Sequence, residues 1–374
     1  MAKRGNGEGS IYQRSSDDRW VGAYTATDGR RRVIYGNTRS EVRDRLVVVQ
    51  REALQGIAQT PARLTVEAFL DQWLDAVKPS LRPRTFASYS DLLRLHVRPR
   101  IGKVALAKLT PRDVQSLVND RLAAGLSPRT VQYVHAVLRR ALGHAEKWGL
   151  VSRNVARLVD GPRVRRAEIH PLTPDEARQL LASVRGSRDE ALYTVAIAMG
   201  LRQGEALALR WSDVDLDAGA LTVRHTLQRL DRKAELMEPK TPKSRRTLSM
   251  PAPVLTALRD HRRRQLEERL AMGEDWQDLD FVFASGIGTP LDASAVTHRY
   301  QRTLLAAGLP RQRFHDTRHA CASFLLAQGV PLRVVQEILG HSRISTTADV
   351  YAHVLPTLQK DAADRMGELL SSSR

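Results

Sequence analysis

The stretch GLRQGEALALRW, residues 200–211, holds an arginine and a glutamate, Arg202 and Glu205, three positions apart and shortly after a glycine, Gly200. Alanine and leucine follow at helical spacing, which predicts that a helix starts at this point. An arginine and a glutamate with this spacing usually form a surface ion pair worth only about a few tenths of a kcal/mol. Whether the pair does more depends on three other polar stretches in the same half of the chain.

One of these stretches is FHDTRHACASFLL, residues 314–326. It sets His315, Arg318 and His319 on one face of a predicted helix. Histidines four apart also bind zinc in some proteases, and His341 would have to supply the third ligand. The glutamate that acts as general base in those proteases is absent, and a positive arginine between the ligands would repel a dication. We therefore predict no metal site; the simplest alternative is the polar first turn of an apolar helix.

The stretch LGHSRISTTADVYAHV, residues 339–354, contains His341 and, ten positions later, Tyr351. The surrounding residues are polar, so an aromatic ring gains little from burial there. The phenol could pack, form a hydrogen bond or act as a nucleophile. A serine nucleophile is not expected, because no G-x-S-x-G elbow occurs in the sequence.

The stretch MEPKTPKSRRTLSM, residues 237–250, predicts a tight turn between two strands. Lysines in turns are usually solvated, and a turn can present only one of Lys240 and Lys243 toward a bound group. We choose Lys240, because it ends the run AELMEPK and begins the turn. Lys243 lies beside Arg245 and Arg246, and all three are predicted to contact the phosphate backbone of DNA.

DNA is expected because of the charge. Lysine and arginine number 59 against 41 acidic residues, so the 374-residue chain carries a formal charge of +18, which predicts a polyanionic partner. Aromatic residues make up 5%, too few for the stacking platforms of single-strand binders, so duplex DNA is favoured. The single cysteine, Cys321, fits a reducing cytoplasmic compartment at the nucleoid. No apolar run of 18 residues occurs, so no membrane partner is expected.

The pattern along the chain predicts a multidomain, mainly α protein with small β elements. Residues 1–60 predict a three-stranded sheet followed by one helix, and residues 61–160 a bundle of four helices with basic outer faces. Residues 170–374 predict a mixed α/β domain with strands inserted at 219–250, and residues 159–172 read as a linker. Hydroxyl caps mark the expected helix starts at Thr38, Thr65, Thr110, Ser127 and Thr173.

Three arginines lie on the turn before the third predicted strand, where contact with DNA is favoured over a packing role. They are Arg30, Arg31 and Arg32. In the helical bundle, His135 and His144 are expected to be surface or half-buried residues without a function.

The polar stretches of residues 170–374 fit one reaction, the cleavage of a DNA phosphodiester. Charge builds up on the non-bridging oxygens of a five-coordinate phosphorus, and a guanidinium suits it because it stays protonated and binds two oxygens at once. The leaving alkoxide needs a proton, which a lysine can donate. The attacking group must become an oxyanion, and a tyrosine with a pKa of ~10 does so more easily beside arginines and an imidazole.

In these motifs the chain resembles the tyrosine recombinases, or phage-type integrases. The family's first arginine lies in a GLRxGE stretch, here GLRQGE, and its HDLRHT box corresponds to HDTRHA. Its LGHS…TT…YxHV tail corresponds to residues 339–354, and its β-turn lysine to Lys240. The motifs keep the family's order over residues 170–360. Thr317 replaces the usual Leu and Ala320 the frequent Thr or Ser, both outside the catalytic positions.

The resemblance implies a role for each site residue. Tyr351 would attack the scissile phosphate and form a 3′-phosphotyrosyl bond. Arg202 and Arg318 would hold the non-bridging oxygens, with His341 as a third donor. The remaining members of the site would be a proton carrier, a general acid and a supporting carboxylate. These are His315, Lys240 and Glu205.

The resemblance also implies no cofactor, since the covalent bond to the tyrosine conserves the energy of the phosphodiester without ATP or metal. The expected partner is duplex DNA, bound at core sites by residues 61–160 and at arm-type sites by residues 1–60. Four protomers would exchange strands as a homotetramer through a four-way junction. An excision factor and a host DNA-bending protein are further candidate partners in integrating or excising a mobile element.

Two alternatives remain at this point. A topoisomerase-like enzyme would use the same chemistry without synapsis, although the N-terminal module argues against it. A DNA-binding regulator would keep the fold and lose catalysis, although the complete set of six catalytic positions argues against that.

Overall fold

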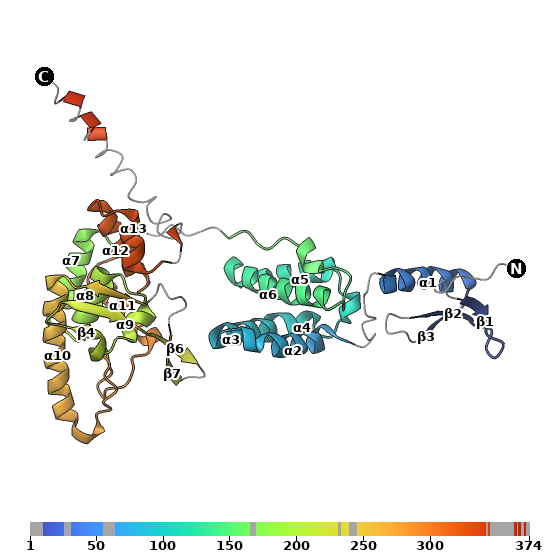
Figure 1. Cartoon of the computed structure of the whole chain (residues 1–374), viewed down its shortest axis with the longest axis horizontal. Coiled ribbons are helices and arrows are strands. Elements are labelled where there is room, and N and C mark those ends of the chain that lie inside the picture. The colour runs from blue at the N-terminus through green and yellow to red at the C-terminus, as the bar shows by residue number, and fades with distance from the viewer. Residues whose placement is uncertain are drawn as a thin grey trace. The chain divides into compact units, whose positions relative to one another are not determined.

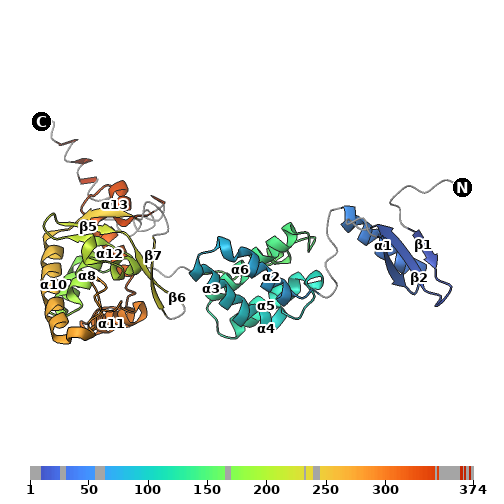
Figure 2. The same ribbon diagram turned by 60° about the horizontal axis from the view of Figure 1, so that its bottom comes forward.

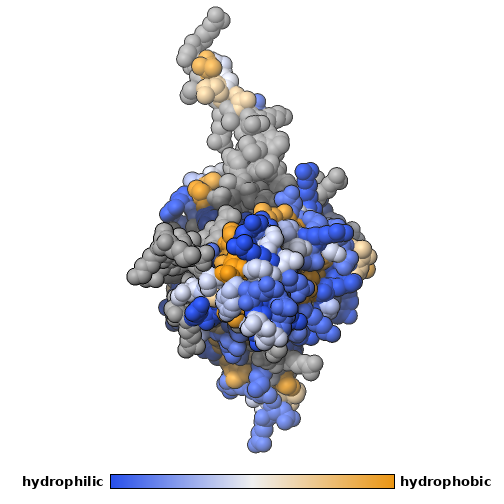
Figure 3. Space-filling view, turned by 90° about the vertical axis from the view of Figure 1, so that its right-hand side faces the viewer, coloured by the Kyte–Doolittle hydropathy of each residue, from blue (hydrophilic) through white to orange (hydrophobic). Residues whose placement is uncertain are grey.

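The computed structural model describes residues 10–25, 31–54, 64–164, 170–230, 233–238, 245–341, 343–344, 363–364, 366–367 and 370–371. It divides into two compact units, Met1–Arg166 and Ala167–Arg374, which we treat separately (Figure 1). None of the described helices is long and apolar enough to cross a membrane. The face of the molecule shown in Figure 3 is mainly hydrophilic, with small apolar patches scattered over it.

The N-terminal sheet has three antiparallel strands in the order β1-β2-β3, and one helix packs against it. The elements are β1 (Ser10–Gln13), β2 (Trp20–Thr25), β3 (Arg31–Gly36) and α1 (Arg39–Leu54). The expected helix start is confirmed, because the N–H of Glu41 donates to Thr38 Oγ1 at 3.2 Å. The carboxylate of Glu41 in turn accepts from the N–H of Asn37 at 2.9 Å.

The predicted helical bundle is confirmed, and its second helix is built from three successive segments. The helices are α2 (Val66–Val77), α3 (Pro83–Leu92), the π-helical η2 (Leu93–Val97), α4 (Arg98–Ile101), α5 (Pro111–Ala123) and α6 (Pro128–Lys147). The hydroxyls of Thr65, Thr110 and Ser127 accept from the backbone of the first turns that they cap. Two short 3-10 segments lie between these helices, η1 (Lys78–Ser80) and η3 (Leu106–Lys108), and a third, η4 (Val155–Leu158), follows α6.

His135 corrects one expectation about this bundle. Its side chain is buried, and a ring nitrogen lies 2.9 Å from the carbonyl oxygen of Ala156. The contact joins α6 to η4, so this histidine has a structural role in the core and not a surface position.

The C-terminal unit surrounds one apolar helix, α8. Its helices are α7 (Pro174–Ser183), α8 (Glu190–Met199), α9 (Gln203–Leu207), η5 (Trp211–Asp213), α10 (Ala252–Met272), η7 (Gly273–Asp275), α11 (Ala293–Ala306), α12 (Asp316–Ala327) and α13 (Leu332–Leu339). Its strands are β4 (Val214–Asp215), β5 (Ala220–Val223), β6 (Thr226–Leu230), β7 (Lys233–Met237) and β8 (Arg246–Ser249). The strand-rich insert expected at 219–250 is therefore confirmed. The Thr173 capping box at the start of α7 is also present.

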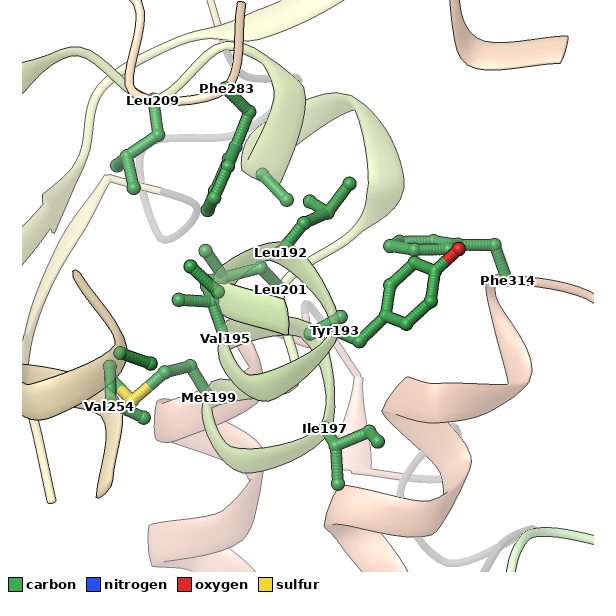
Figure 4. Close-up of a cluster of buried hydrophobic side chains, with 14 of the residues drawn as sticks. Leu192, Tyr193, Val195, Ile197, Met199, Leu201, Leu209, Val254, Phe283 and Phe314 are labelled. Carbon is green, nitrogen blue, oxygen red and sulfur yellow. The ribbon is translucent and has the colours of Figure 1, made fainter. Parts of the chain in front are cut away.

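The core forms around α8 because this helix is apolar on every side, and eight of its ten residues are buried. It packs against α10 and α12 (Figure 2), and its side chains fill the cluster drawn in Figure 4. The ring of Phe314 stands edge-on to the rings of Tyr193 and Tyr300, with centroids 6.2 and 5.4 Å apart. Phe314 therefore anchors the chain in the core one residue before His315.

The strands of the C-terminal unit form two small antiparallel groups, a sheet in the order β4-β5-β8 and the hairpin β6-β7. In the sheet, the buried Leu248 of β8 pairs with Leu221 of β5, and Arg246 pairs with Val223. The described parts of the predicted linker, residues 159–164 and 170–172, contain no helix or strand.

Candidate active site

The pair that opened the sequence analysis is half-buried: Glu205 is buried, and the Arg202 side chain is 37% exposed. Arg202 stands at the N-terminus of α9, and its Nη1 donates to Glu205 Oε1 at 2.5 Å. The Glu205 carboxylate also accepts from the backbone N–H of Arg202 at 3.1 Å. Because Glu205 is only 4% exposed, this is not the surface ion pair that the spacing usually produces.

Arg318 is buried on α12, and both ends of its guanidinium bind backbone carbonyls. Nη1 donates to the oxygen of Gly200 at 2.7 Å and Nη2 to that of Leu339 at 2.5 Å. Burial, with the nearby positive charge of Arg202, lowers the pKa of Arg318 to about 9, so it stays charged at neutral pH. The two carbonyls fix the direction in which this cation points.

The C-terminus of α13 lies where these arginines meet. Gly340 ends the helix with a φ of +64°, a left-handed conformation that favours glycine. Its carbonyl accepts from Arg202 Nη2 at 2.9 Å, next to the Leu339 carbonyl that binds Arg318. The next residue, His341, is held by Gln336, whose carbonyl accepts from the His341 N–H and whose side-chain amide donates to the His341 carbonyl, both at 3.0 Å.

Two histidines of the predicted site carry strongly lowered pKa values. Burial of the ring, followed by the charges of His319 and Arg318, lowers the pKa of His315 to about 4, although the residue as a whole is exposed. Burial and the charges of Arg318 and Arg202 lower the pKa of His341 to about 3. Both imidazoles are therefore neutral at neutral pH.

Comparison with known proteins identifies the family of the chain that carries this cluster. Residues 170–357 match the phage integrase family, and residues 65–122 match the N-terminal SAM-like domain of phage integrases. The chain belongs to the phage integrase family. The resemblance recognised in the sequence motifs is thereby confirmed.

Relatives of this family match nearly the whole chain, and solved structures match its fold. It is 32% identical to an integrase of Streptomyces ambofaciens, over 97% of this chain and 97% of that relative. It is 29% identical to a XerC-like tyrosine recombinase of Caldanaerobacter subterraneus, over 91% and 92%. Its fold is similar to that of the Tn1549 transposon integrase in complex with transposon right end DNA (TM-score 0.69, 20% identity, 81% of this chain and 100% of that chain). A lambda integrase tetramer bound to a Holliday junction has a TM-score of 0.58 at 17% identity, over 93% and 96%. The predicted multidomain, mainly helical fold is confirmed.

Arg246 lies in a different environment from the DNA-facing one predicted for it. Its side chain is 7% exposed, and Nη2 donates to Glu205 Oε2 at 3.0 Å while Nε donates to the carbonyl of Ile338 at 2.7 Å. Arg245, in contrast, is exposed and binds Glu238 at 2.7 Å. Strand periodicity was the signal that sequence reasoning missed, because Arg246 shares its face of β8 with the buried Leu248.

Four predicted site residues lie outside the described residues: Arg30, Lys240, Lys243 and Tyr351. Arg31 and Arg32 open β3, the first exposed and the second half-buried. Within the described ranges, no group of three or more His, Cys, Asp or Glu residues is arranged to hold a metal ion.

Proposed function

We propose that this family member is a site-specific DNA recombinase, an integrase that cleaves and rejoins duplex DNA through a 3′-phosphotyrosyl bond to Tyr351. Its biological task would be to integrate or excise a mobile element or phage genome. One observation carries the proposal: Arg202 and Arg318, from separate motifs, converge on the carbonyls that directly precede His341. The chain reaches Tyr351 ten residues further on.

The arginines would bind the scissile phosphate. Each uses guanidinium hydrogens on backbone carbonyls, so its direction is fixed before DNA arrives. A guanidinium held in this way needs no reorganisation to stabilise charge on the non-bridging oxygens, which is how electrostatic preorganisation lowers a barrier. Arg202 and Arg246 share the carboxylate of Glu205, so the cluster keeps an excess of positive charge for an anion.

The histidines and a lysine would handle the protons. In this proposal His315 accepts the proton of the tyrosine, and His341 donates a hydrogen bond to the phosphate from its neutral ring. Lys240 would protonate the leaving 5′ oxygen. It belongs to the connection between β7, which ends at Met237, and β8, which starts at Arg246.

The N-terminal unit would also bind DNA. A shallow groove of about 400 Å³ on α6 is lined by cationic side chains, including Arg139, Arg140 and Lys147, which suits the phosphate backbone at a core site. Arg31 at the exposed start of β3 would contribute to arm-type sites. By analogy with the lambda integrase tetramer on a Holliday junction, we propose that four copies act together on DNA.

A nicked duplex that loses its short strand after cleavage tests the proposed function. Wild type should accumulate a covalent adduct on the 3′ side of the break, with EDTA present. Tyr351→Phe should bind the same DNA and form no adduct. An adduct with the Phe variant would move the nucleophile elsewhere, and DNA binding by wild type without any adduct would favour a DNA-binding regulator.

A further inference from the structure

Three consecutive carbonyls at the end of α13 bind three different arginines. The oxygen of Ile338 accepts from Arg246, that of Leu339 from Arg318 and that of Gly340 from Arg202. The last carbonyls of a helix have no partner within the helix and carry the negative end of its dipole, so they favour cations. The end of α13 therefore binds all three arginines of the cluster.

Arg246 differs from the other two arginines in what its guanidinium does. It reaches from β8 to two elements at once, to α13 through Ile338 and to α9 through Glu205. Glu205 is the carboxylate that holds Arg202. The contacts form a closed path from α13 through Arg246, Glu205 and Arg202 back to α13.

We propose that Arg246 is a positioning residue of the recombination site. It fixes the end of α13 against α9, and thereby sets the direction of Arg202 and the point from which the chain continues through His341. This inference rests on the proposed function and removes Arg246 from the predicted contacts with the DNA backbone.

The geometry requires an arginine at this position. Its two donors, Nε and Nη2, point to different partners, which the single ammonium of a lysine cannot reproduce. The guanidinium also lies against Gly340, where an added Cβ would be 3.0 Å from Nη1 and 3.2 Å from Cζ. A lysine would keep the charge but lose one of the two bonds and this contact.

The charge of Glu205 offers a readout specific to this role. Burial raises the pKa of Glu205, but the opposing charges, Arg246 before Arg202, outweigh it and hold the pKa below its usual value. Among the described residues, the charged groups that act on this carboxylate are Arg202 beside it, Arg246 from β8 and Arg318 from α12. Removing Arg246 should therefore raise the pKa of Glu205.

The test compares Arg246→Met and Arg246→Lys with Arg299→Met in the full-length protein. Arg299 serves as a control for the loss of an ion-paired arginine, because its Nε makes a partly buried ion pair with Asp189 at 2.6 Å, apart from the arginine cluster. At saturating nicked duplex, both Arg246 variants should form adduct about 10²-fold more slowly, the effect of a displaced catalytic group, with DNA affinity close to wild type. Arg299→Met should lose thermal stability and keep its cleavage rate.

Two further measurements separate positioning from general damage to the fold. In Arg246→Met the acid side of the cleavage-rate profile should move to higher pH, and in Arg299→Met it should stay in place. The double variant with Arg246→Met and Glu205→Gln should lose much less cleavage rate than the product of the two single losses predicts. Both substitutions break the same chain of contacts between α13 and Arg202.

The outcomes distinguish this inference from the proposed function. Weaker DNA binding by the Arg246 variants with an unchanged rate at saturation would make Arg246 a backbone contact and overturn the inference. A normal rate in Arg246→Lys, or an unshifted profile in Arg246→Met, would also overturn it. If wild type itself forms no adduct, the proposed function fails first.

Discussion

Gly200 provides a sharp test of how the site is held together. It ends α8 with a φ of +59°, and its carbonyl accepts from Arg318 Nη1 at 2.7 Å. A Cβ at this position would lie 2.5 Å from Leu339 Cδ2 and 3.0 Å from Cys321 Sγ. Gly200→Ala should therefore strain the backbone and also push apart α8, α12 and α13.

The loss of stability from backbone strain and the loss from displaced side chains can be separated with a second glycine. A left-handed conformation costs an alanine ~1–2 kcal/mol, and inserting a methyl into packed side chains typically costs ~1–3 kcal/mol more. Gly308 follows α11 with a φ of +69° and has no atom within 4 Å of an added Cβ, so Gly308→Ala bears only the first cost. Gly200→Ala should lose about 1–3 kcal/mol more stability than Gly308→Ala.

The assay is urea unfolding of the full-length variants, followed by amide hydrogen exchange in α8 and α12. Adduct formation on nicked DNA should also be about 10²-fold slower in Gly200→Ala, because the carbonyl that directs Arg318 moves. Gly308→Ala should cleave like wild type. Equal losses of stability in the two variants, or a normal cleavage rate in Gly200→Ala, would refute the packing argument.

Four other predictions concern protons, salt, the lysines and the N-terminal module. Because the folded protein lowers the pKa of His341 from 6.5 to about 3, the unfolded chain binds this proton first, so stability should fall as the pH drops below about 6.5. The thermal midpoint of His341→Asn should depend less on pH between 6.5 and 4.5 than that of wild type. DNA affinity should fall about 10³–10⁵-fold between roughly 50 and 200 mM salt if roughly 6–10 phosphates are neutralised, and a flat response would contradict extensive backbone contact. Lys240→Ala should slow cleavage by about 10²-fold or more, and a 5′-bridging sulfur should restore much of the rate; rescue of Lys243→Ala instead would exchange their roles. Deleting residues 1–55 should leave cleavage of core-site DNA intact and weaken recombination at arm-type sites, and loss of core cleavage would place the module in the catalytic fold.

Features set by neighbouring residues were predictable from the sequence. Thr65, Thr110 and Thr173 each accept from the backbone N–H three residues ahead, so the hydroxyl and the helix start belong to the same short segment. The strand insert follows from alternating residues in the same way. The motif order was equally readable, because a family match depends on spacing along the chain.

The partners in distant contacts were not predictable. The periodicity of β8 places Arg246 on the buried face, but it does not reveal that Ile338, 92 residues away in sequence, offers a carbonyl at the end of a helix. Likewise His135 is drawn into the core by Ala156, 21 residues later. Neither partner has a distinctive side chain at the point of contact, since both contribute only backbone oxygen.

The same backbone oxygens explain how several cations can be held close together before DNA is bound. Three described neighbours do not neutralise these cations: His315 and His341 are uncharged at neutral pH, and burial, partly opposed by Arg318, raises the pKa of Cys321 to about 12. Carbonyl dipoles satisfy the guanidinium hydrogens without removing charge, and Glu205 removes only part of it. The arginines are therefore fixed in direction by dipoles while an excess of positive charge is retained, and this excess would attract a phosphate. Its arrival should also raise the pKa of His341, because the field that keeps this imidazole neutral would then be offset.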